Sequence, residues 1–197
     1  STWRVSYSAT GLWTTLNTSI TTAQDLLVGD FNGDGKADIF YGDGSTWRFN
    51  YSATSSWVVV NSSATKAADL LIADFNNDGK DDLFHGTGSQ WLVSYNGQNW
   101  QQVNTSITTV AELQAADFNG DGKADIFYGD GSNWRINYSA NSSWQVVNSS
   151  ATNANNIKIG DFNNDGNQDV FHATGTKWIV SYSGTSLWNQ INTSITQ

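Results

Sequence analysis

The chain has 197 residues and a formal net charge of −9, from 9 basic and 18 acidic residues, and it contains no cysteine, proline or methionine. This length suffices for one domain with a sizeable core, and the lack of cysteine excludes disulfides and zinc–thiolate sites. Basic residues do not cluster and no apolar run approaches a membrane span. We therefore expect neither nucleic acid as a partner nor a membrane-spanning segment.

The chain begins with a strand pattern that lacks an acidic loop. Tyr7 follows Trp3 by four residues, which places both side chains on one face of a strand, and Trp13 begins a second strand after a small polar turn. Residues 1–22 therefore predict an outer pair of strands without inner partners.

An acidic loop of nine residues follows and occurs four times, at residues 30–38, 74–82, 117–125 and 161–169. The first aspartates of these loops are 44, 43 and 44 residues apart, a period that indicates a propeller or solenoid. An apolar strand precedes each loop, a β-forming run follows it, and a glycine turn then leads into two strands that each begin near a Trp.

Each repeat thus predicts four short antiparallel strands, and no stretch shows helical periodicity. We predict an all-β fold, a β-propeller with one loop-bearing hairpin per blade, formed by residues 1–197 as a single domain. The expected units are an orphan outer half-blade at 1–22 and repeats at about 23–66, 67–109, 110–153 and 154–197.

The loop composition predicts calcium. Positions 1, 3, 5 and 9 carry Asp, Asn, Asp and Asp, position 6 is Gly, and position 7 can offer its backbone carbonyl, which suits a hard cation with about six to eight oxygen ligands. An EF-hand is excluded because position 12 is Tyr or His instead of Glu. A rigid polar turn without metal is the alternative, but three carboxylates in every loop repel one another and favour a bound cation.

About four calcium ions per chain would cancel most of the negative charge, and loops of this kind fill where calcium is near millimolar, which predicts a secreted protein. The predicted ligands are Asp30, Asn32, Asp34, Lys36, Asp38, Asp74, Asn76, Asp78, Lys80, Asp82, Asp117, Asn119, Asp121, Lys123, Asp125, Asp161, Asn163, Asp165, Asn167 and Asp169, where position 7 (Lys or Asn) contributes its carbonyl.

The unit strand–DFNGDGxxD–strand resembles the FG-GAP/VCBS repeat of integrin α-chain propellers and of secreted microbial propellers, including sugar-binding lectins. The resemblance covers all four full repeats and implies calcium in the hairpin between the first and second strands of each blade. Adhesion modules, lectins and enzyme-attached domains all occur in this family, so the resemblance implies the fold and the metal more directly than the function.

Two features depart from a simple ring. The chain has four loop-containing halves but five Trp-containing halves, so we expect a homodimer in which two chains form one larger ring with the N-terminal half-blade at the junction. A second period of 87 residues alternates repeats that carry Tyr and Trp-Arg with repeats that carry His and Trp-Leu or Trp-Ile.

A calcium-stabilised lectin with repeated sites between blades is the preferred functional hypothesis. Sugars are recognised by an aromatic face and by polar groups that bond their hydroxyls, although Trp and Tyr can equally fill the wedge between blades. The candidate carbohydrate-binding residues are Trp3, Arg4, Tyr41, Trp47, Arg48, Trp57, His85, Trp91, Tyr128, Trp134, Arg135, Trp144, His172 and Trp178.

The alternative is a protein-interaction or adhesion module of the integrin-propeller type without sugar binding. We expect no enzyme, because the two histidines occupy equivalent repeat positions and no asymmetric set of catalytic groups is evident. Asn-x-Ser/Thr sequons recur with the repeat and are expected to be structural turns; they lie at Asn17, Asn50, Asn61, Asn104, Asn137, Asn141, Asn148 and Asn192.

Overall fold

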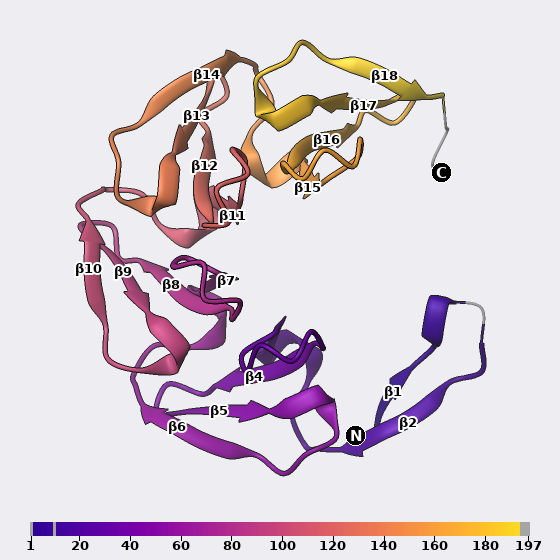
Figure 1. Cartoon of the computed structure of the whole chain (residues 1–197), viewed down its shortest axis with the longest axis vertical. Coiled ribbons are helices and arrows are strands. Elements are labelled where there is room, and N and C mark those ends of the chain that lie inside the picture. The colour runs from indigo at the N-terminus through magenta and orange to yellow at the C-terminus, as the bar shows by residue number, and fades with distance from the viewer. Residues whose placement is uncertain (1, 10, 194–197) are drawn as a thin grey trace.

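The computed structural model describes residues 2–9 and 11–193, and they form four four-stranded antiparallel blades and one two-stranded sheet. The blades follow one another in chain order around a common centre, as Figure 1 shows, with the last strand of each blade on the outside. This confirms the predicted all-β propeller fold. Within the described residues, no helix is long and apolar enough to cross a membrane.

The N-terminal half-blade is β1 (Thr2–Val5) and β2 (Thr14–Thr18). Blade 1 is β3 (Leu26–Gly29), β4 (Asp38–Gly42), β5 (Thr46–Asn50) and β6 (Val58–Ser62), and blade 2 is β7 (Leu71–Ala73), β8 (Asp82–Gly86), β9 (Trp91–Ser94) and β10 (Gln101–Asn104). Blade 3 is β11 (Leu113–Ala116), β12 (Asp125–Gly129), β13 (Asn133–Asn137) and β14 (Gln145–Ser149), and blade 4 is β15 (Lys158–Gly160), β16 (Asp169–Ala173), β17 (Trp178–Ser181) and β18 (Asn189–Asn192).

Short 3-10 turns, which the sequence did not predict, connect these strands. They are η1 (Tyr7–Ala9), η2 (Ala23–Asp25), η3 (Tyr51–Ala53), η4 (Ala67–Asp69), η5 (Tyr95–Gly97), η6 (Val110–Glu112), η7 (Tyr138–Ala140), η8 (Ala154–Asn156) and η9 (Tyr182–Gly184).

The core lies between blades, because each blade presents an aromatic face to the apolar face of the next. Phe40, Trp47 and Phe49 of blade 1 are almost fully buried and pack in one cluster with Leu70 and Leu83 of blade 2. Period-two alternation puts Phe40 and Phe49, which pair across β4 and β5, on the same face. Burying each such side chain contributes roughly 1.5–3 kcal/mol, so blade stacking is a main source of stability.

Tryptophan pairs cross the blade boundaries. Trp47 meets Trp100 of the next blade in a T-shaped pair with ring centroids 5.1 Å apart, and the same geometry recurs at 5.0 to 5.5 Å for Trp3–Trp57, Trp91–Trp144 and Trp134–Trp188. Edge-to-face pairs of this kind contribute about 0.5–1.5 kcal/mol beyond the area they bury. The two Trp registers therefore join neighbouring blades.

Sequon asparagines also join the blades. Asn61 of blade 1 donates from Nδ2 to the carbonyl oxygens of Gly97 (3.1 Å) and Gln98 (2.9 Å) in blade 2. Asn17, Asn104 and Asn148 make equivalent bonds to the turn of the following blade. The hydrogen bonds of these side chains therefore link each blade to the next.

A β-bulge follows the first Trp of every sheet. In blade 1, Trp47 pairs with Asn61 and Arg48 with Val59, so Val60 is the extra residue of β6. Val60 packs into the core cluster between blades 1 and 2. The bulge therefore turns an additional apolar side chain inward.

The blades form an open arc, with the N-terminal half-blade at one end and blade 4 at the other (Figure 1). The expected homodimer, in which two chains form one larger ring, stays a prediction.

Candidate functional site

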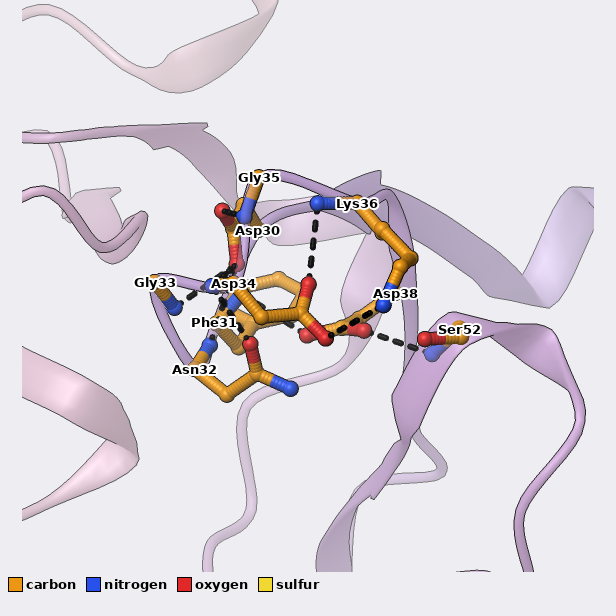
Figure 2. A network of polar contacts seen from close by, with 9 residues as sticks. All are labelled: Asp30, Phe31, Asn32, Gly33, Asp34, Gly35, Lys36, Asp38 and Ser52. Carbon is orange, nitrogen blue, oxygen red and sulfur yellow. Dashed lines mark hydrogen bonds and ion pairs between the residues drawn. The ribbon is translucent and has the colours of Figure 1, made fainter.

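The acidic loop is built around its first carboxylate. In the first loop, Oδ1 of Asp30 accepts the backbone N–H of Gly33 at 2.7 Å and Oδ2 accepts that of Gly35 at 2.7 Å, so the chain wraps this side chain (Figure 2). Asn32 and Asp34 continue the pattern by accepting N–H groups two residues further on, at 2.8 and 2.9 Å. Local hydrogen bonds therefore position the side-chain oxygens of Asp30, Asn32 and Asp34.

Positive φ angles explain the loop's alternation between Asn-Gly and Asn-Asn. Gly33 has φ 76° and Gly35 has φ 78°, and position 4 of the second and fourth loops is Asn77 (φ 63°) and Asn164 (φ 59°). Glycine and asparagine tolerate this left-handed backbone best, so the loop requires one of them at position 4.

The last aspartate of each loop is fully buried and links the loop to a distant turn. Asp38 accepts the N–H of Phe31 at 3.0 Å and, through its other oxygen, the N–H of Ser52 at 2.6 Å (Figure 2). Ser52 sits in the left-handed region, with φ 52°. The same bridge is made by Asp82 with Phe75 and Asn96, Asp125 with Phe118 and Ser139, and Asp169 with Phe162 and Ser183.

Burial disfavours the ionised form of two of these carboxyl groups. It raises the pKa of Asp82 to about 7, and the negative charges of Asp78 and Asp74 add to the rise although two backbone N–H groups oppose it. Burial likewise raises the pKa of Asp125 to about 6. At Asp30, by contrast, burial is outweighed by hydrogen bonds from backbone N–H groups, which lower its pKa. A nearby cation would favour the ionised form of Asp82 and Asp125.

The oxygen donors fit calcium in chemistry, but their carboxylates do not form a ready-made cage. In the part of the chain that the structure describes, no group of three or more His, Cys, Asp or Glu side chains is placed to hold a metal ion. A complete ligand set would have to include the Asn amide oxygen and a backbone carbonyl. Lys36 also competes for the first loop, because its Nζ lies 3.3 Å from Oδ2 of Asp34 at an exposed position.

A second constellation, the Tyr–Asp–Arg–Trp cluster, recurs in blades 1 and 3. In blade 3 the ring of Tyr128 lies 5.8 Å from that of Trp144, and Arg135 pairs across the strands with Tyr128 and lies 3.3 Å from Asp130. Backbone N–H groups of Asn133 and Ser132, together with the Arg135 guanidinium, lower the pKa of Asp130, so this carboxylate is a ready hydrogen-bond acceptor.

Blade 1 repeats this cluster with Tyr41, Asp43, Arg48 and Trp57. The Arg48 guanidinium lies 5.8 Å from the centre of the Tyr41 ring and 4.0 Å from Asp43, and Tyr41 packs 5.8 Å from Trp57. The structure therefore brings together six predicted residues in two equivalent clusters: Tyr41, Arg48, Trp57, Tyr128, Arg135 and Trp144.

Blades 2 and 4 replace tyrosine with histidine. His85 and His172 each place Nδ1 at 2.7 Å from a backbone carbonyl, of Asp69 and Asn156 respectively, and each ring packs near a Trp, at 5.9 Å from Trp100 and 6.0 Å from Trp188. With Nδ1 as the donor, Nε2 remains free to accept a hydrogen bond.

Pockets lie at the blade boundaries beside these residues. A pocket of about 220 Å³ is lined by Tyr128, Asp130, Glu112 and Asn153, and an equivalent pocket of about 410 Å³ is lined by His85 and Thr109. Two further equivalent pockets contain a half-buried Trp among amide and hydroxyl groups: Trp57 with Asn50 and Ser55 in about 380 Å³, and Trp144 with Asn137 and Ser142 in about 290 Å³.

The structure corrects part of the predicted carbohydrate set. Trp47, Trp91 and Trp134 are 0% exposed, so they cannot touch a sugar and instead fill the wedge between blades. Trp178 is half-buried at the end of the arc, and Trp3 and Arg4 line a separate groove beside the half-blade. None of these residues belongs to the Tyr–Asp–Arg–Trp clusters.

Sequence reasoning missed several pocket residues. Asp130 lies in the glycine turn, which the sequence pattern indicates only as a connection. Glu112 and Asn153 lie in or beside the 3-10 turns η6 and η8. The turn sequence Gly-Asp-Gly, which appears in both Trp-Arg repeats, was the available signal for Asp43 and Asp130.

Comparison with known proteins supports the repeat assignment. The family model described as FG-GAP-like repeat matches residues 30–85, 74–128 and 117–172, each match running from one acidic loop through the next. A comparison with curated proteins finds no match.

The solved structures that are similar to this chain include a toxin pore and a biofilm matrix protein. The Photorhabdus luminescens Tc holotoxin pore shares 12% identity over 91% of this chain and 10% of its own, with a TM-score of 0.62. The V. cholerae biofilm matrix protein Bap1 shares 20% identity over 90% of this chain and 32% of its own, with a TM-score of 0.40. This chain spans only a tenth and a third of those two proteins, and the toxin likeness shows the fold alone.

Proposed function

The chain belongs to the FG-GAP-like repeat family, and from this premise we propose that it is a secreted, calcium-stabilised protein that binds glycans at repeated sites between its blades. The observation that carries the proposal is the Tyr–Asp–Arg–Trp cluster, which recurs in blades 1 and 3, where Trp57 and Trp144 each line an equivalent pocket with amide and hydroxyl groups. Binding without catalysis is part of the proposal.

The chemistry of each cluster suits a sugar. The aromatic pair of Tyr128 and Trp144 offers an apolar surface for the C–H face of a pyranose, while Asp130 and Arg135 offer an acceptor and donors for its hydroxyls. At about 220 Å³, the pocket beside Tyr128 is smaller than the roughly 300–1,000 Å³ of drug-sized ligand pockets, so it would hold one residue of a glycan.

Repetition compensates for weak single sites. Equivalent clusters 87 residues apart can engage two branches of a glycan-coated surface, and linked weak sites gain avidity without any new contact. The histidine pockets of blades 2 and 4 would differ in specificity, because imidazole replaces the phenol and Arg is absent there.

Calcium has a structural role in this proposal. The loop oxygens of Asp30, Asn32, Asp34 and Asp38, the carbonyl at position 7, and their counterparts in the other loops would hold the ion. Calcium would supply positive charge that offsets the repulsion among the aspartates of a loop. This requirement for near-millimolar calcium supports a secreted location.

A glycan array run with and without calcium tests the function. The lectin proposal requires specific glycan hits, whereas an adhesion module that recognises only protein gives none and thereby refutes it. The double variant Arg48→Ala and Arg135→Ala should bind the best glycan at least tenfold more weakly with a nearly unchanged melting temperature, since both side chains are partly exposed. Lys177→Ala, at an exposed turn of blade 4, is the matched control and should bind normally.

A further inference from the structure

The N-terminal half-blade has an open inner edge. In blade 1, the third strand β5 pairs on its inner side with β4, through Trp47 with Gly42 and Phe49 with Phe40. The equivalent strand of the half-blade, β1, pairs with β2 alone in the described residues. Its opposite edge therefore presents backbone donors and acceptors that another strand can use.

An apolar groove lies beside this edge. It has a volume of about 570 Å³ and is lined by Trp3, Leu26, Val28 and Ile39, among others. The corresponding groove between blades 1 and 2 is filled, because Phe31 and Phe40 of the inner hairpin pack there in the core cluster and leave Leu70 and Leu83 at most 4% exposed. At the half-blade, Val28 is 61% exposed.

Ser8 in the half-blade has the same backbone conformation as the residue that binds the last loop aspartate in each complete blade. Its φ is 54°, close to the 52° of Ser52, whose N–H donates to the last aspartate of the first loop. Asn96, Ser139 and Ser183 make the same bond in the other blades. Within the described residues, the N–H of Ser8 makes no such bond. The half-blade therefore has the donor of this bond but lacks the aspartate that accepts it in the complete blades.

The first loop also lacks a neighbour on this side. The N–H at position 8 of each later loop donates to the carbonyl of the first aspartate of the loop before it: Asp81 to Asp30 at 2.7 Å, Ala124 to Asp74 at 2.7 Å and Gln168 to Asp117 at 2.9 Å. Ala37 occupies position 8 of the first loop and makes no equivalent bond among the described residues.

We propose that the half-blade is the acceptor site for a β-hairpin with the same acidic loop, supplied by a repeat outside residues 1–197. The hairpin pairs antiparallel with β1 and places two phenylalanine rings in the groove. Its last loop aspartate accepts the N–H of Ser8, and the carbonyl of its first loop aspartate accepts the N–H of Ala37. These four requirements select this hairpin type over an arbitrary apolar strand.

A whole second copy is not the occupant. The inner strands of all four blades are already paired within their own sheets, so a second copy has no free loop-bearing hairpin to offer. A single hairpin requires only the space that one pair of inner strands takes in each complete blade.

Fusion of a hairpin to the chain tests the proposal. A second copy of residues 22–44 is placed directly ahead of Ser1, because the strand after this segment in blade 1 corresponds to β1. The fusion should raise the melting temperature by roughly 5 °C or more and slow amide exchange in β1 and β3.

Three variants of the fusion sharpen the result. Replacing the added copies of Phe31 and Phe40 by Ser should abolish the increase in melting temperature. Val28→Asp in the groove should abolish it too, whereas the unfused chain should tolerate this change because Val28 is exposed there. Replacing the added copy of Asp38 by Ala should remove part of the increase. A fusion that melts no higher than its double-serine control, or that is indifferent to Val28→Asp, overturns the proposal.

Discussion

Without calcium, the protein should become less stable as the pH rises from about 4 to about 8. Asp82 and Asp125 are 0% exposed, and burial raises their pKa values from the usual 3.8 to about 7 and about 6. Below pH 3.8 both groups are protonated in the folded and unfolded chain alike, and the raised pKa values make their full stabilising contribution to the free energy of unfolding. That contribution is lost as the pH rises through the folded-state values, because the folded chain must then bury an anion.

The size of the effect follows from these shifts. At about 1.36 kcal/mol per pKa unit, Asp82 accounts for roughly 4 kcal/mol and Asp125 for roughly 3 kcal/mol, as upper limits, since a loop that rehydrates reduces the penalty. The sum of these two contributions is a large fraction of the free energy of unfolding of a typical domain, which is about 5–15 kcal/mol. The metal-free protein should therefore be marginal at pH 8.

Urea unfolding of metal-stripped protein across this pH range measures the effect. Saturating calcium should flatten the curve, because positive charge beside the loop aspartates lowers their pKa. Asp125→Asn removes one ionisable group and keeps one acceptor oxygen, so it should reduce the pH slope of the metal-free protein. Equal stability of the metal-free protein at pH 5 and pH 8 would refute the reasoning.

Three further outcomes are expected. Chelation at neutral pH should lower the melting temperature far more than a matched change of ionic strength, and an unchanged melt contradicts the calcium assignment. Asn61→Ala should lower the free energy of unfolding, measured by chemical denaturation, by about 1 kcal/mol because it removes the hydrogen bonds to Gly97 and Gln98. Asn141→Ala, at an exposed position, should leave it almost unchanged, and equal losses in the two variants would contradict the role of Asn61 in joining the blades. Secretion through a glycosylating host should modify Asn141 and leave Asn61 unmodified by mass spectrometry, and a glycan on Asn61 in folded protein speaks against the bond.

Local sequence patterns predicted the blades well. The spacing of the acidic loops, the β-forming run after each loop and the two Trp registers together confine every strand to a narrow range, and the structure confirms four-stranded antiparallel blades. These features could be read from the sequence because each depends on residues close together along the chain.

Features that depend on packing between repeats could not be predicted in this way. Alternation places Trp47 on one face of its strand, but only the stacked blades show that this face is buried. Tyr41 and Arg48 pair on the other face and are half-buried. The bulge at Val60 has no turn residue to signal it. The curvature of the arc results from the summed rotation of all blades.

The perpendicular tryptophan pairs give the protein an optical signal of its own. Each pair takes one indole from each of two neighbouring blades, with centroids 5.0 to 5.5 Å apart. Indole transitions this close couple to each other and produce paired circular-dichroism bands of opposite sign. Separation of two blades abolishes this coupling even where the strands within each blade persist. Spectroscopy can therefore follow the docking of blade on blade separately from the formation of the sheets.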